Sequence, residues 1–127
     1  MNGKHTLEII ADNGNKSTSF TFTFTKKVTE ADITLKEALA VEGDISVAVL
    51  KIEGSIPEDA IITVLVTNNG KDSNPVWQDA TTQVLNDKNI VFTNKENING
   101  AAFNFKVNIK RGSSDTGGYI TSINGAF

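Results

Sequence analysis

Two segments of the chain alternate strictly between apolar and polar residues. Residues 19–25 place three phenylalanines between hydroxyl-bearing residues, and residues 103–110 alternate Phe, Val and Ile with polar side chains. A period of two is that of a β-strand with one buried face and one face in water. We therefore predict two amphipathic strands. Their inward rows are Phe20, Phe22 and Phe24 in one, and Phe103, Phe105, Val107 and Ile109 in the other. Their outward rows are Thr21, Thr23 and Thr25 in one, and Asn104, Lys106 and Asn108 in the other.

Shorter runs of β-forming residues predict further strands. We expect strands over residues 6–10, 44–53, 61–67, 90–93 and 119–123. Five Asn-Gly pairs, which favour turns with positive φ, lie mostly beside these runs. Asn13-Gly14 separates the first two strands and predicts that they form a hairpin. Turns placed beside β-forming runs in this way are typical of a mainly antiparallel protein.

One segment has the signals of a helix. Thr34 and Glu37 have the spacing of a capping box, and Gly43 stands where a left-handed cap ends a helix. The pattern predicts a short helix of about two turns near residues 34–42, lying across an open end of the sheets.

The chain is the length of a single domain. It has 127 residues, with no internal repeat and no proline-rich linker. We expect residues 1–127 to form one mainly β domain, an antiparallel two-sheet β-sandwich of the immunoglobulin-like or jelly-roll-like kind, with the short helix near residues 34–42.

Composition and charge exclude several functions. The formal net charge is −3 with no basic cluster, so nucleic acid is not an expected partner. No cysteine is present to form a disulfide, a thiolate zinc site or a nucleophile. No stretch approaches the ~20 apolar residues of a membrane span, so no membrane partner is expected. The first residues lack the pattern of a signal peptide, so we expect a product made in the cytoplasm without export.

Groups for catalysis are scarce. His5 is the only histidine, and its place near the terminus favours a frayed end over a general base or metal ligand. The glycine-rich residues 112–118 precede a predicted strand and not a helix, which favours a hairpin tip over a phosphate loop. We expect no enzyme activity, no catalytic residue, no metal site and no cofactor.

The richest polar stretch surrounds the only tryptophan. Asp72 and Asp79 flank Trp77, a composition that suits either a sugar site or a structured turn. The residues lack the spacing of a calcium loop. We expect Asp72 and Asn74 to make turn hydrogen bonds and Trp77 to pack in the core. In the alternative interpretation, Trp77 stacks on a glycan and Asp72 and Asp79 contact the ligand.

Several segments together carry a resemblance to a known group of proteins. They are Pro75-Val76-Trp77-Gln78-Asp79-Ala80-Thr81, residues 91–95, residues 100–107, Lys110-Arg111-Gly112 and residues 118–127. These aromatic-rich strands, the Arg-Gly turn and the glycine-aromatic ending resemble small β-sandwich proteins encoded in the structural-gene modules of tailed bacteriophages and prophages of Firmicutes. The likeness is densest from residue 61 onward.

The resemblance implies a virion component with no enzymatic residues. A head decoration or another accessory assembly protein is the expected function, with other virion structural proteins as partners and homo-oligomers in the particle. A module that binds carbohydrate or another host-surface component is the alternative. Since the apolar faces of the two clearest strands are committed to the core, we expect polar contacts through sheet edges and loop tips, repeated over many copies.

Overall fold

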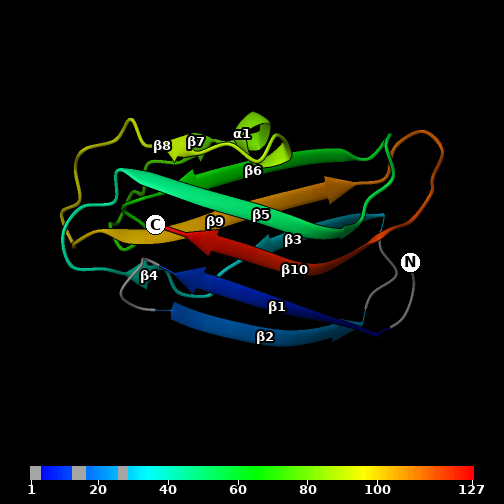
Figure 1. Cartoon of the computed structure of the whole chain (residues 1–127), viewed down its shortest axis with the longest axis horizontal. Helices are drawn as coiled ribbons and strands as arrows, with labels where there is room; N and C mark the ends of the chain where they lie inside the picture. Colours follow the sequence, from blue (N-terminus) through cyan, green and yellow to red (C-terminus); the bar gives the residue numbers. More distant parts are fainter. Residues whose placement is uncertain (1–3, 13–16, 26–28) are drawn as a thin grey trace.

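A computed structural model describes residues 4–12, 17–25 and 29–127, with side chains from residue 29 onward. The chain forms a β-sandwich, two sheets packed face to face with one short helix at the side (Figure 1). The expected fold class is therefore confirmed. The strands are β1 (Lys4–Asp12), β2 (Ser17–Thr25), β3 (Glu30–Thr34), β4 (Leu39–Ala40), β5 (Val47–Ser55), β6 (Ile61–Thr67), β7 (Gln78–Asp79), β8 (Ile90–Val91), β9 (Ala102–Lys110) and β10 (Tyr119–Ala126), and the helix is α1 (Thr81–Leu85).

The strand order is that of a jelly roll. One sheet, called sheet A, has the order β2-β1-β10-β5-β8, and the other, sheet B, has the order β3-β9-β6-β7 with β4 also paired to β9. Six of the nine connections between the described strands cross from one sheet to the other, and β9 and β10 lie in different sheets. In an immunoglobulin fold the last two strands share a sheet. Among the described strand pairs, β1 and β10 run parallel and the others are antiparallel.

The core lies between the two sheets and is centred on β9. Phe103, Phe105 and Val107 of this strand are almost fully buried. The ring of Phe103 stacks on Phe127 at 4.8 Å between centroids and meets Phe92 edge-on at 6.4 Å. The predicted inward row of β9 is thus confirmed in its buried residues, and Lys106 is exposed on the opposite face, as expected.

Most of the predicted strands are confirmed. β6 spans the expected residues 61–67, and β1 and β2 pair antiparallel from Lys4 opposite Thr25 to Asp12 opposite Ser17. The Asn-Gly turn between them lies outside the described residues. The sides to which the β2 phenylalanines and threonines point also lie outside the description.

The predicted helix near residues 34–42 is wrong. Thr34 ends β3, and Leu39–Ala40 form β4, so both ends of the segment pair with β9. Between them, the backbone N–H of Leu35 donates to Asn104 Oδ1 at 3.2 Å, and Asn104 Nδ2 donates to the Leu35 carbonyl at 3.3 Å. An isolated two-turn helix is only marginally stable. Pairing to β9 therefore overrides the local helix signals.

Two smaller expectations also need correction. Residues 44–53 alternate at Ile45, Val47 and Val49 and then shift to Leu50 and Ile52, which predicted Val47 and Val49 on the inner face. In the structure Ala48 and Leu50 are buried and Val47 and Val49 are exposed, so the shift comes before Ala48. Residues 112–118 are not a hairpin tip, because β9 and β10 do not pair. This loop crosses from sheet B to sheet A at one end of the sandwich (Figure 1, orange).

A buried polar cluster closes the opposite end. Asn68 follows the last residue of β6, and its Nδ2 donates to the carbonyls of Ile45 at 3.0 Å and Asn94 at 2.9 Å. Asn94 Nδ2 donates back to Asn68 Oδ1 at 2.8 Å. These hydrogen bonds join three loops and give each buried polar group of the cluster a partner. The cluster therefore offers no free polar group to a ligand.

The core account predicts that Phe103→Ala destabilises the protein strongly. Phe103 is 2% exposed, and truncating such an aromatic costs about 3 to 5 kcal/mol. The matched control is Ile98→Ala, because Ile98 is 87% exposed and its truncation should change stability by no more than about 0.5 kcal/mol. Urea unfolding of the two variants measures the difference, and equal midpoints would contradict this core.

Candidate functional site

The only tryptophan lies outside the core, contrary to expectation. Trp77 is half-buried just before the edge strand β7, and the Lys106 Nζ lies 4.0 Å from its ring centroid. Lys106 and Asp79 are both register partners of Leu65 and so occupy one row across the outer face of sheet B. The edge position explains the error, because β7 has no strand on its other side to cover an aromatic ring.

Asp72 accepts backbone hydrogen bonds from a distant loop, whereas the sequence predicted hydrogen bonds within its own turn. Its carboxylate accepts from the backbone N–H of Asn99 at 2.7 Å and of Ile98 at 3.0 Å, and from Asn69 Nδ2 at 3.0 Å. The hydrogen bond from the Asn99 N–H is the main reason that the pKa of Asp72 lies below its usual value, and burial opposes it. Asp72 therefore holds two loops together, and nothing in its contacts joins it to the Trp77 ring.

Asp79 is also engaged in local structure. Its Oδ1 accepts from the backbone N–H of Thr81 at 2.9 Å, the residue at which α1 begins. That hydrogen bond lowers the pKa of the Asp79 carboxyl. Of the three candidate contact residues, the structure thus brings Trp77 and Asp79 to one region and leaves Asp72 to a loop junction.

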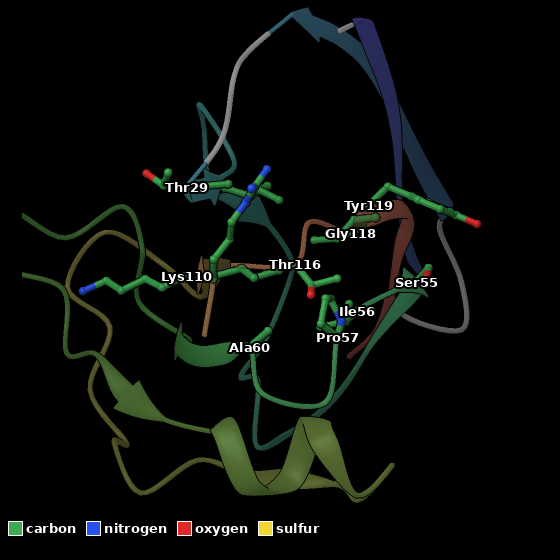
Figure 2. Close-up of a pocket in the computed structure, with 14 residues that line it drawn as sticks. Thr29, Ser55, Ile56, Pro57, Ala60, Lys110, Thr116, Gly118 and Tyr119 are labelled. Atoms are coloured by element: carbon green, nitrogen blue, oxygen red, sulfur yellow. The ribbon is translucent and has the colours of Figure 1, made fainter. Parts of the chain in front are cut away.

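A pocket that the sequence did not predict opens at the end of the sandwich where the glycine-rich loop crosses. It has a volume of about 90 Å³ and is lined by both sheets and two loops. Figure 2 shows Ile56, Pro57 and Ala60 from the β5–β6 connection, and Thr116 and Gly118 from the β9–β10 connection. Ile33, Ile109 and Ile120 add apolar surface from the strands.

The walls of the pocket are fixed by close contacts between the two loops. The backbone N–H of Ser114 donates to Asp59 Oδ2 at 2.8 Å. The Ser114 side chain first, and then this backbone hydrogen bond, lower the pKa of the Asp59 carboxyl. A Cβ at Gly112 would collide with the Asp59 carbonyl oxygen, and one at Gly118 would collide with that of Ser55. The glycines of the loop are therefore needed for close approach, a requirement that becomes visible only when the facing loop is known.

Arg111 supplies a cation to the pocket wall. Its NH1 donates to the Asp115 carbonyl oxygen at 3.0 Å and lies 3.4 Å from Asp115 Oδ1. Its Nε–H is buried and meets no acceptor among the residues that the structure describes. The sequence analysis used Arg111 only as part of the Arg-Gly turn and did not predict its place in a pocket wall.

Over the described ranges, no three His, Cys, Asp or Glu side chains gather closely enough to hold a metal ion. His5 lies within β1, opposite Phe24, so its backbone belongs to the sheet and is not a frayed end. No helix within the described part of the chain is long and apolar enough to cross a membrane. The absence of catalytic, metal and cofactor sites stays a prediction.

Comparison with known proteins found no matching family model, no matching curated protein and no matching solved structure.

The hydrogen bonds to Asp72 predict how acid affects stability. A carboxyl with a lowered pKa in the folded state stabilises the protein above its ordinary value of 3.8 and loses that effect as pH falls through the folded value. Asp72→Asn should therefore lower the unfolding midpoint at neutral pH, and the gap from wild type should shrink as the pH falls below 3.8. Glu58→Gln, at an exposed position, is the control and should show little change in the unfolding midpoint at neutral pH. A gap for Asp72→Asn that is constant with pH would contradict this role.

Proposed function

We propose that the chain is a non-enzymatic structural protein of a tailed-bacteriophage virion, a head decoration or another accessory assembly component. The resemblance of residues 75–81, 91–95, 100–107, 110–112 and 118–127 to small virion sandwich proteins supports this proposal. The jelly-roll order of the sheets is compatible with it, because viral capsid domains use that architecture, although lectins and cupins use it too.

The observation that carries the proposal is the outer face of sheet B, where polar groups are cross-linked to one another. Asn108 Nδ2 donates to Glu30 Oε1 and to Asp32 Oδ1, both at 2.7 Å. Lys110 Nζ lies 3.7 Å from Glu30 Oε1. A face held in place by its own hydrogen bonds suits a wet, repeated contact better than a catalytic cleft.

A second surface offers a small apolar contact. Val47 and Val91 are register partners on β5 and β8, and they are 43% and 63% exposed. Val49 lies two positions along β5 on the same outer face of sheet A. We call these three residues the valine strip. Because it lies at the β8 edge, it fits attachment through a sheet edge, with many copies on a lattice compensating for a small area per copy.

We expect the purified protein to co-sediment with phage particles that lack it. Val91→Glu places a charge in the valine strip and should weaken rebinding at least tenfold. Ile98→Glu is the matched control, because it adds the same charge to another highly exposed apolar position and should rebind normally. Quantitative sedimentation with depleted particles measures both. Wild-type protein that stays in the supernatant while binding intact host cells would refute the virion proposal.

A glycan-binding module is the second candidate, because Trp77 lies outside the core with Asp79 in the same region. One face of its ring has the Lys106 Nζ at 4.0 Å from the centroid, so a sugar would have to stack on the other face. If this candidate is correct, cell-wall polysaccharide fragments should change the fluorescence of this single tryptophan, and Trp77→Ala should abolish binding measured by calorimetry.

The control for the glycan experiment is Tyr119→Ala, which removes an exposed aromatic ring from the other end of the sandwich and should leave binding intact. Unchanged fluorescence at saturating polysaccharide would exclude Trp77 as a stacking platform. Because Trp77 is not a core residue, Trp77→Ala should also cost less stability than Phe103→Ala.

A further inference from the structure

Strand β3 ends sheet B on one side, and its outer edge has no strand beside it in the described part of the chain. The backbone N–H of Arg111 donates to the Thr29 carbonyl at 2.9 Å, so these residues form a hydrogen-bonded pair just before β3 begins. Hydrogen-bonded and non-hydrogen-bonded pairs alternate along antiparallel strands. The even-numbered residues of β3 therefore direct their N–H and C=O groups away from β9. They are Glu30, Asp32 and Thr34, and we call these outward backbone groups the β3 edge.

The β3 edge is accessible. Its three residues are all exposed, and among the described residues no hydrogen bond reaches their outward backbone groups. The same alternation, continued across β9 to β6, directs the Val64 carbonyl to the far side of the sheet, where it accepts from the Ala80 N–H at 2.9 Å. This agreement supports the alternation. Backbone donors and acceptors open to a further strand therefore lie along β3.

Sheet A offers a surface on which an added strand could pack. Ile33 of β3 and Ile120 of β10 line the same pocket, so β3 faces β10 across the sandwich. Past β10, sheet A continues with β1 and β2, whereas the described part of sheet B ends at β3 (Figure 1). A strand added to the β3 edge would therefore lie over sheet A. Its inward side chains would continue the row of Ala31 and Ile33, and Ile33 is only 7% exposed, so apolar residues suit these positions.

The outer face beside the β3 edge is acidic. Asn108 Nδ2 donates to Glu30 Oε1 and to Asp32 Oδ1, both at 2.7 Å, and so fixes the two carboxylates side by side. Lys110 Nζ lies 3.7 Å from the same Glu30 oxygen. The second oxygen of each carboxylate meets no donor among the residues that the structure describes. Because opposite charges on neighbouring strands stabilise a sheet, Lys or Arg suits the outer positions of an added strand.

A second copy of the chain does not suit this edge. The antiparallel register that pairs the whole of two β3 strands is centred on Asp32, and it would place two Asp32 side chains directly opposite each other. Like charges in that position are destabilising, and charged side chains are a common means of preventing edge strands from pairing with their own copies. The partner that fits is therefore a different polypeptide.

We propose that the β3 edge binds an extended segment of another polypeptide as an added strand of sheet B. The segment alternates Lys or Arg on the outer side with apolar residues on the side that faces sheet A. Backbone hydrogen bonds to the β3 edge supply affinity, and the carboxylates of Glu30 and Asp32 select the basic residues. The proposal is independent of the virion function, because it rests on the geometry and charge of the β3 edge alone.

The probe is a short acetylated and amidated peptide that alternates lysine with valine. It is titrated into the full chain, and amide hydrogen exchange is followed by NMR. In the free protein, we expect the N–H groups of the β3 edge to exchange faster than those of Ala31 and Ile33, which pair with β9. At saturation, the peptide should slow exchange at the β3 edge at least tenfold. The same peptide with glutamate in place of lysine should bind at least tenfold more weakly.

Two pairs of variants separate charge from backbone pairing. Asp32→Asn should weaken binding of the lysine peptide at least fivefold, whereas Glu96→Gln, which removes an exposed negative charge from the β8–β9 loop, should leave it unchanged. Thr34→Pro removes one outward N–H without altering charge and should also weaken binding at least fivefold. Proline is tolerated where a strand N–H faces away from the sheet, so the fold should be retained. Thr34→Val keeps this N–H and should bind as the wild type does.

Binding without the alternating protection would overturn the proposal, because it would show only attraction between a cationic peptide and an acidic surface. Equal affinity of the lysine and glutamate peptides would overturn it too. Protection of the β3 edge that rises with protein concentration in the absence of peptide would identify a second copy as the partner instead. Absence of binding by both peptides would also overturn it, and would mean that Glu30 and Asp32 serve only to keep the β3 edge unpaired.

Discussion

The structure depends on strand β9, which is paired on both sides and provides the largest side chains of the core. β3 and β4 pair with one edge of β9, and β6 pairs with the other. On its inner face Phe103 contacts Phe92, Phe105 and the last residue, Phe127, so one aromatic ring connects β9 to distant parts of the chain. On its outer face Asn104, Lys106 and Asn108 hold neighbouring segments through polar contacts. Alternation along one strand thus determines both the core and the exposed surface of sheet B.

The two ends of the sandwich have different characters because different loops close them. Where β6 ends, the Asn68 side chain donates hydrogen bonds to backbone carbonyls of two loops, and this polar cluster is closed to solvent. Where β6 begins, glycines let the β9–β10 loop approach Asp59, and the pocket with Arg111 stays open between the loops. The open end and the outer faces of the sheets are therefore the surfaces that remain available for contact.

Local alternation predicted the strands, but the contacts between distant segments decided the remainder. β9 could be predicted because its own residues carry the period of two, and β6 because its run is rich in β-forming residues. Residues 34–42 carry a capping box, which favours a helix, as well as β-forming neighbours, which favour a strand. Only the two hydrogen bonds between Asn104 and Leu35 decide between helix and strand. The exposure of Trp77 follows from the position of β7 at a sheet edge, which no local pattern specifies.

The pocket was harder to predict from the sequence than the strands were, because its residues come from both sheets and two loops. The glycine-rich loop and the Lys110-Arg111 pair were visible, yet their meaning depended on Asp59, more than fifty residues earlier in the chain. Asp72 shows the same limit, because the turn sequence predicted local hydrogen bonds, whereas its backbone donors, Ile98 and Asn99, lie 26 and 27 residues away.

The central claim is that this sandwich is a non-enzymatic component that is attached to a virion through its exterior. Cryo-electron microscopy of tailed-phage particles from the strain that encodes the chain tests this claim most directly. The account predicts density for a two-sheet sandwich at repeated positions on the particle, with the valine strip or the outer face of sheet B against the neighbouring protein. Particles complete in every structural protein but without this density would contradict the account.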